Sequence, residues 1–303
     1  MNLRDIHARA KAVAAVARLP LRSGQWSGTA GNVLGRGAGS STDFQDHRQY
    51  VPGDDPRHMN WQAYARTGHY TMKLYREEVT PRIDLVYDGS ESMFLDATKA
   101  ERVFELFYFC IESGLRIGGH MKLFVLGRAA GDAPEELPLE RALADGWPAA
   151  ITAAGAGGPR RRGPDAAAEP AGLADQLDRV PLRAGSLRVL VSDLLDESPP
   201  ARVASRLAAA RSRGIVLAPC GRAESDPDWD GNVEFEDAER ATRSRQRVDP
   251  GMLDRYRQAY KRHFAAWREE CARRALGFAR VGDAGDLIAA LRGEAVPAGV
   301  IEM

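Results

Sequence analysis

Short apolar runs alternate with helical stretches from residue 82 almost to the end of the chain. The runs at 83–87, 121–126, 187–192, 214–219 and 278–281 are typical of buried strands. Helical periodicity fills the intervals at 96–114, 173–177, 200–212, 252–275 and 284–291, and residues 233–235 predict a short edge strand. Alternating strands and helices indicate a parallel sheet. We therefore expect an α/β fold with a doubly wound, mainly parallel sheet flanked by helices.

The first 80 residues have a different pattern. Residues 1–22 predict a short helix with Ile6, Ala10 and Val13 on one face and Pro20 at its end. The Gly-rich stretch 24–39 predicts a loop or irregular structure, and residues 71–79 predict an extended strand or arm. This gives three expected parts, which are an N-terminal segment 1–80 with an irregular or β arm, an α/β domain 81–295 and a tail 296–303.

Composition narrows the class of protein. Lys+Arg 42 balances Asp+Glu 42, so net charge points neither to nucleic acid nor to an anionic membrane. No apolar run approaches the ~20 residues that span a bilayer, and the N-terminus lacks a signal-peptide pattern. Cys110, Cys220 and Cys271 are widely spaced, which predicts buried reduced thiols rather than disulfides or a zinc site. These features predict a cytoplasmic protein.

Charge is uneven near the C-terminal end. Residues 222–239 are predominantly acidic, and residues 240–280 are predominantly basic. One interpretation is that the two blocks pair with each other within the fold. The other is that the basic block is a docking face for an acidic partner.

Polar side chains follow two of the predicted strands. Asp88 comes directly after the strand at 83–87, with hydroxyls at Ser90 and Ser92, and Asp193 follows the strand at 187–192. If these strands are parallel neighbours, their carboxyl ends meet at the edge of the sheet where ligands of such folds bind. Carboxylate and hydroxyl oxygens suit Mg²⁺, so the sequence predicts a metal site there. The alternative is that the same side chains only cap local turns.

Catalytic motifs are scarce. The six His residues form no metal-type spacing, and no Ser lies in a nucleophile-elbow sequence. Asp88-x-Ser90 also departs from the Asp-x-Asp of phosphoaspartyl hydrolases. We therefore expect no enzymatic activity. The alternative that stays open is a Mg²⁺-dependent phosphate-ester hydrolase in which Asp88 and Asp193 hold the ion.

Two motifs carry a family resemblance. Asp88-x-Ser90-x-Ser92 with the later Ser192-Asp193 resembles a von Willebrand factor A-like domain. The longer stretch 48–66 resembles the signature of a bacterial family catalogued as domain of unknown function 58, and the likeness extends from about residue 35 over nearly all of the chain. The signature residues are Arg48, Tyr50, Pro52, Gly53, Asp54, Asp55, Arg57, Trp61 and Arg66.

The resemblance implies a metal-dependent protein-interaction module. In A-like domains the two hydroxyls, here Ser90 and Ser92, ligate Mg²⁺ or Mn²⁺, the two acids act through water, and a partner's carboxylate completes the site. A third loop normally supplies a Thr, but Thr152 is the sole Thr in the matching region and we do not assign it. Relatives are commonly encoded beside MoxR-type AAA+ ATPases, which implies an adaptor for such an ATPase and an unidentified client. Many relatives carry membrane helices before the signature, so this chain resembles a soluble variant.

The signature segment, residues 48–66, has two interpretations. As a structural clasp, Pro52-Gly53 makes a turn, Asp54 and Asp55 pair with nearby Arg side chains, and Trp61 anchors the segment by burial. As a docking surface, the same segment contacts the ATPase.

Overall fold

The computed structural model describes residues 1–20, 30–38, 44–127, 133–144, 172–237 and 242–303. The chain divides into two compact units. The α/β unit comprises Met1–Pro20, Arg82–Arg116 and Met121–Met303, and the small unit comprises Leu21–Pro81 and Ile117–His120.

A six-stranded sheet forms the centre of the described α/β unit, in the order β11-β8-β7-β4-β5-β6. Its strands are β4 (Arg82–Tyr87), β5 (His120–Val125), β6 (Glu135–Leu137), β7 (Leu187–Val191), β8 (Arg213–Cys220) and β11 (Gly277–Gly282). The pairs β4–β7, β7–β8 and β8–β11 are parallel, whereas β6 runs antiparallel to β5. The predicted mixed α/β fold with a mainly parallel sheet flanked by helices is confirmed.

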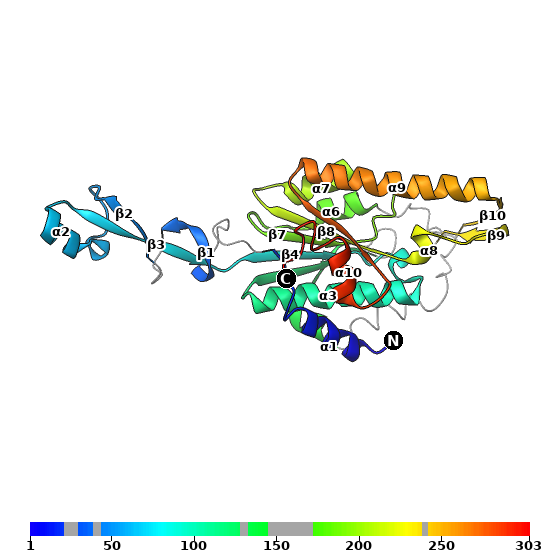
Figure 1. Cartoon of the computed structure of the whole chain (residues 1–303), viewed down its shortest axis with the longest axis horizontal. Helices are drawn as coiled ribbons and strands as arrows, with labels where there is room; N and C mark the ends of the chain where they lie inside the picture. Colours follow the sequence, from blue (N-terminus) through cyan, green and yellow to red (C-terminus); the bar gives the residue numbers. More distant parts are fainter. Residues whose placement is uncertain (21–29, 39–43, 128–132, 145–171, 238–241) are drawn as a thin grey trace. The chain divides into compact units, whose positions relative to one another are not determined.

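Helices cover both faces of this sheet. The helices among the described residues of this unit are α1 (Leu3–Val13), α3 (Ala97–Arg116), α4 (Leu139–Leu143), α6 (Leu173–Arg179), α7 (Pro200–Ala208), α8 (Arg222–Ser225), α9 (Pro250–Arg273) and α10 (Leu287–Gly293). Figure 1 shows α6, α7 and α9 along one face and α1 and α3 along the other. The core under α9 packs Trp267 and Phe264 against strand residues such as Leu190 and Val216. Burial of these apolar side chains positions the strand ends that carry the polar residues.

The two ends of the chain belong to the α/β unit, which differs from the predicted division. The small Ala10 and neighbouring apolar residues let α1 pack closely on α3, where His7 Nε2 lies 2.7 Å from Glu112 Oε1. In the predicted tail, Ile301 is buried and the backbone N–H of Glu302 donates to Arg18 O at 2.9 Å. The helix and the tail therefore complete the α/β unit instead of flanking it.

The small unit is built on three strands. The strand β3 (Thr71–Val79) pairs antiparallel with both β1 (Ala30–Ala38) and β2 (Phe44–Gln49). The predicted strand at 71–79 is thus confirmed, but part of the Gly-rich stretch forms β1 where we expected a loop; its residues 24–29 and 39 lie outside the described residues. A 3₁₀ turn (Pro56–His58) and the short helix α2 (Trp61–Thr67) complete the unit.

The charged blocks pair with each other. β9 (Gly231–Glu236) and β10 (Arg243–Val248) form a separate two-stranded sheet, so residues 233–235 do not extend the central sheet. Across it, Arg245 Nε lies 3.0 Å from Glu234 Oε1, and Arg243 pairs with Glu236 at 3.2 Å. This confirms the interpretation of pairing within the fold. Among the described helices, none has both the length and the apolar character needed to cross a bilayer.

Candidate functional site at the carboxyl edge of the sheet

Asp88 and Asp193 lie at the point where the strand order reverses. From β4 the chain passes to β5 on one side of the sheet, and β7 lies on the other side. The register places Tyr87 beside Val191, so the residues that follow emerge together, and the Asp88 N–H donates to Val191 O at 2.9 Å. Such a switch point is where open α/β sheets bind their ligands. The predicted meeting of the two strand ends is confirmed.

Asp88 is buried and engages both of its oxygens. Oδ1 accepts the Ser90 N–H at 2.9 Å, and Oδ2 accepts the Ser192 hydroxyl at 2.6 Å. The Ser90 and Ser92 hydroxyl oxygens lie 3.1 Å apart. The structure therefore brings the predicted Asp88, Ser90 and Ser92 together, and it adds Ser192, which the sequence analysis missed as a partner of Asp88.

The turn after β7 presents Asp193. Leu194 has a φ of +61°, a left-handed conformation that costs free energy in a residue other than Gly. Its N–H donates to Ser192 Oγ at 3.1 Å, and its carbonyl oxygen lies 2.8 Å from His263 Nε2. These contacts hold the turn in place. Asp193 Oδ1 then accepts the Leu195 N–H at 3.2 Å.

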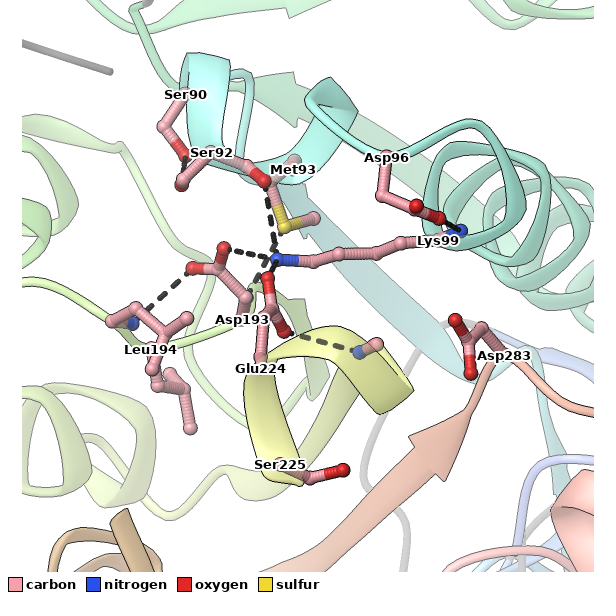
Figure 2. Close-up of polar contacts among 12 residues, drawn as sticks. Ser90, Ser92, Met93, Asp96, Lys99, Asp193, Leu194, Glu224, Ser225 and Asp283 are labelled. Atoms are coloured by element: carbon pink, nitrogen blue, oxygen red, sulfur yellow. Dashed lines mark hydrogen bonds and ion pairs between the residues drawn. The ribbon is translucent and has the colours of Figure 1, made fainter. Parts of the chain in front are cut away.

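A buried lysine joins the site. Lys99 of α3 is 1% exposed, and its ammonium donates to Asp193 Oδ2 at 2.8 Å and to the Ser92 carbonyl oxygen at 3.1 Å. It also pairs with Glu224 of α8 (Figure 2). Sequence reasoning missed Lys99 and Glu224. The available signal was the position of Lys99 on the same helical face as Val103 and Leu106.

Burial governs the ionisation of these groups. It raises the pKa of Asp88 to about 6, and the nearby Asp193 carboxylate adds to the shift. Burial also raises the pKa of Glu224, although Lys99 opposes this. Burial alone lowers the pKa of Lys99, but Asp193 and Glu224 outweigh it, so the net shift is upward. Lys99 is therefore a charged ammonium at neutral pH.

The raised pKa of Asp88 predicts a pH-dependent effect of Asp88→Asn. Below the ordinary pKa of 3.8 the carboxyl is protonated in both the folded and unfolded states, and its burial carries no charge penalty. As the pH rises through the folded pKa of about 6, the folded protein must hold a buried charge, and stability is lost. We expect the melting temperature of Asp88→Asn, relative to the wild type, to rise between about pH 4 and about pH 7. Thermal unfolding at a series of pH values measures this, and a constant difference would contradict it.

The donor set fits a divalent cation only at the two hydroxyls. Their separation matches adjacent corners of a Mg²⁺ octahedron, about 3 Å apart for bonds of about 2.1 Å. The two acids, however, are already bonded within the protein, and the Lys99 ammonium supplies positive charge next to Asp193. The described residues hold no group of three or more His, Cys, Asp or Glu placed for a metal, and Thr152 lies outside them. As folded, these residues do not fit a resident divalent cation. Binding of Mg²⁺ or Mn²⁺ stays a prediction of the family resemblance alone, and the donor set does not support it.

The polar residues of the signature segment hold its turn. The Arg48 guanidinium donates to both oxygens of Asp54, at 2.7 and 2.5 Å, and Asp54 also accepts the Val51 N–H at 2.8 Å. Gly53 has a φ of +105°, which favours glycine. Arg57 bonds to Asp55 and lowers its pKa to about 2. These contacts within the signature segment support its interpretation as a structural clasp.

The contact of Arg66 and the exposure of the aromatic side chains do not fit the interpretation of this segment as a structural clasp. Arg66 donates to the Gln62 carbonyl oxygen at 3.4 Å, within its own helix. Trp61 is 58% exposed, so the expectation that it anchors the segment by burial is wrong. A seven-residue helix on a three-stranded sheet leaves too little core to cover so large a side chain.

Three exposed aromatic side chains among the described residues of the small unit form what we call the aromatic patch, which consists of Trp61, Tyr64 and Tyr70. The rings of Tyr64 and Tyr70 stack at 4.6 Å, and Trp61 meets Tyr64 edge-on at 6.2 Å. These contacts make the three aromatic side chains one continuous feature of the surface.

Comparison with known proteins gives both a family and a correction. The solved structures that are similar to this chain include two for which the comparison covers 72% of this chain and 98% of the other. One is an aerotolerance-related membrane protein from Bacteroides fragilis NCTC 9343 with multiple mutations to serines (13% identity, TM-score 0.34). The other is the conserved hypothetical protein BatB from Bacteroides thetaiotaomicron (11% identity, TM-score 0.33). No curated protein matches the chain.

The description of the first structure as a membrane protein contradicts the cytoplasmic location that we expected, and that expectation is corrected. Amino-acid composition and the lack of a long apolar run in the sequence do not determine where a protein is located. The family itself follows from the sequence, because residues 46–270 match the family described as "Protein of unknown function DUF58". This match covers most of the sequence, and the chain therefore belongs to the DUF58 family.

Proposed function

We propose that this protein is a non-catalytic protein-interaction module that acts as an adaptor for a MoxR-type AAA+ ATPase in the maturation of client complexes. The observation that carries the proposal is the aromatic patch, which lies within and beside the signature segment. Family membership supports the type of partner, since the signature resembles that of proteins encoded beside such ATPases.

The exposure of the patch favours docking over a purely structural role. Trp61 is 58% exposed and Tyr70 is 49% exposed. Contiguous exposed apolar surface marks interaction sites, and Trp and Tyr are enriched among the residues that dominate binding energy. The polar contacts of Arg48 and Asp54 hold the segment that presents these side chains. We infer that the ATPase binds the aromatic patch.

The α/β unit supports a second contact. The strand order with an antiparallel edge strand, and a polar site at the switch point, are consistent with a von Willebrand factor A-like domain. Leu95 comes shortly after Ser92 in the chain and Leu195 comes shortly after Asp193, and both leucine side chains are exposed. We propose that the client binds this edge of the sheet, with apolar contacts beside the polar residues.

The contacts of the two acids argue against the phosphate-ester hydrolase. Such an enzyme needs Asp88 and Asp193 free to hold Mg²⁺ and a bound water. Asp88 accepts two hydrogen bonds from the protein, and Asp193 is paired with Lys99.

The test combines binding with turnover. We expect the purified chain to bind the MoxR-type ATPase of its own genome and to leave p-nitrophenyl phosphate unhydrolysed in Mg²⁺. Because a chelator also strips Mg²⁺ from the ATPase nucleotide, the metal is tested in the adaptor itself with Ser90→Ala combined with Ser92→Ala, which should bind as the wild type does. Turnover that is lost in Asp88→Ala, or no binding by the wild type, would refute the proposal.

A further inference from the structure

At the carboxyl edge of the central sheet, the positive charge beside Asp193 belongs to a side chain of the protein. We propose that the Lys99 ammonium takes the place of the predicted divalent cation, so that the loops of this edge are joined by an internal charge. The proposal concerns the same edge as the proposed client contact, but it does not depend on binding of the ATPase.

Lys99 connects three segments that follow three parallel strands. Ser92 lies in the 3₁₀ turn Glu91–Phe94 after β4, Asp193 follows β7, and Glu224 lies in α8 after β8. Figure 2 shows the ammonium at the centre, with its dashed lines reaching each segment. A divalent ion bound by the predicted ligands would join the first two of these segments, and Lys99 joins the third to them as well.

The number of partners matches the chemistry of an ammonium. Lysine has three N–H donors and no acceptor, and Lys99 has one oxygen from each segment within reach. The second oxygen of each carboxylate, which does not face Lys99, accepts a hydrogen bond from the backbone. The Leu195 N–H donates to Asp193, and the Gly221 N–H donates to Glu224 at 3.0 Å. Each carboxylate is thereby oriented with one oxygen toward Lys99.

The helix holds the lysine in position. Asp96 accepts the backbone N–H of Lys99 at 2.9 Å and so caps the first turn of α3. The rest of the stem is buried, which fixes the ammonium beside Asp193. A divalent ion brought to the same carboxylate would be repelled by this fixed charge.

We expect a divalent metal ion to bind at this edge only when the Lys99 ammonium has been removed. The wild type should bind no Mn²⁺ in an electron paramagnetic resonance titration, and its melting temperature should be the same in Mg²⁺ and in EDTA. Lys99→Met leaves two carboxylates without their cation, so its melting temperature in EDTA should fall on the order of 10 °C. Mg²⁺ should restore part of this loss, and the variant should bind Mn²⁺.

Lys11→Met is the matched control, because Lys11 is an exposed lysine of the same unit with a looser ion pair, 3.9 Å from Glu112. It should change neither readout. Mn²⁺ binding by the wild type would overturn the proposal, as would Lys99→Met that melts like the control or that gains nothing from Mg²⁺. If Lys99→Met does not fold, the milder Lys99→Gln is judged by the same criteria. None of these readouts involves the ATPase, so this proposal and the adaptor function can fail separately.

Discussion

Replacing Trp61 by Ala should weaken binding of the MoxR-type ATPase by about 30-fold or more, because truncation of an interface Trp commonly costs about 2 kcal/mol or more. The side chain is mostly exposed and makes an edge-on contact with Tyr64, so its removal takes little from the fold. Surface plasmon resonance with the immobilised ATPase gives the affinities of variant and wild type. Circular dichroism verifies that both are folded.

Val16→Ala is the matched control for Trp61→Ala. Val16 is an equally exposed apolar residue, at 59%, in the α/β unit. It should leave the affinity unchanged. Equal losses in both variants would show that exposed apolar surface in general, and not the aromatic patch, binds the ATPase.

Replacing Asp84 by Ala should destabilise the protein by about 3–5 kcal/mol, the cost of removing one partner of a buried ion pair. Asp84 is fully buried in β4, where it accepts the Arg183 Nε–H and the Ser186 hydroxyl, both at 2.7 Å. The substitution leaves these donors without their acceptor. Urea unfolding followed by circular dichroism measures the free energy of unfolding.

Asp175→Ala serves as the comparison for Asp84→Ala. Asp175 lies on the surface in α6 and pairs with Arg202 at 2.7 Å. An exposed pair contributes at most about 1 kcal/mol, so a much smaller loss is expected. Similar losses for the two variants would contradict the importance assigned to the buried network.

The central sheet could be predicted because its inner strands are continuous apolar runs. Leu187–Val191 is buried along its whole length, which is typical of a strand covered on both faces. The edge strand β6 has the sequence Glu-Glu-Leu and carries no such signal. The strand β1 lies in a Gly-rich stretch, and its pairing with β3 is irregular, so local pattern indicated a loop.

The part of the candidate site that lies directly at the strand ends could be predicted from the sequence. Asp88 and Asp193 meet because parallel neighbours end at the same edge, which follows from fold class alone. Lys99 and Glu224 reach the site from a helix and from a third strand end, and their meeting depends on how those elements pack. The exposure of Trp61 likewise depends on the size of the small unit, which the signature itself does not encode.

The most direct test of the proposed function is amide hydrogen exchange of the full chain with and without the MoxR-type ATPase. We expect the ATPase to slow exchange in residues 50–70, around the aromatic patch, and to leave exchange at the sheet edge around Asp88 and Asp193 unchanged. Unaltered exchange in residues 50–70 in the presence of a bound ATPase would contradict docking on the aromatic patch.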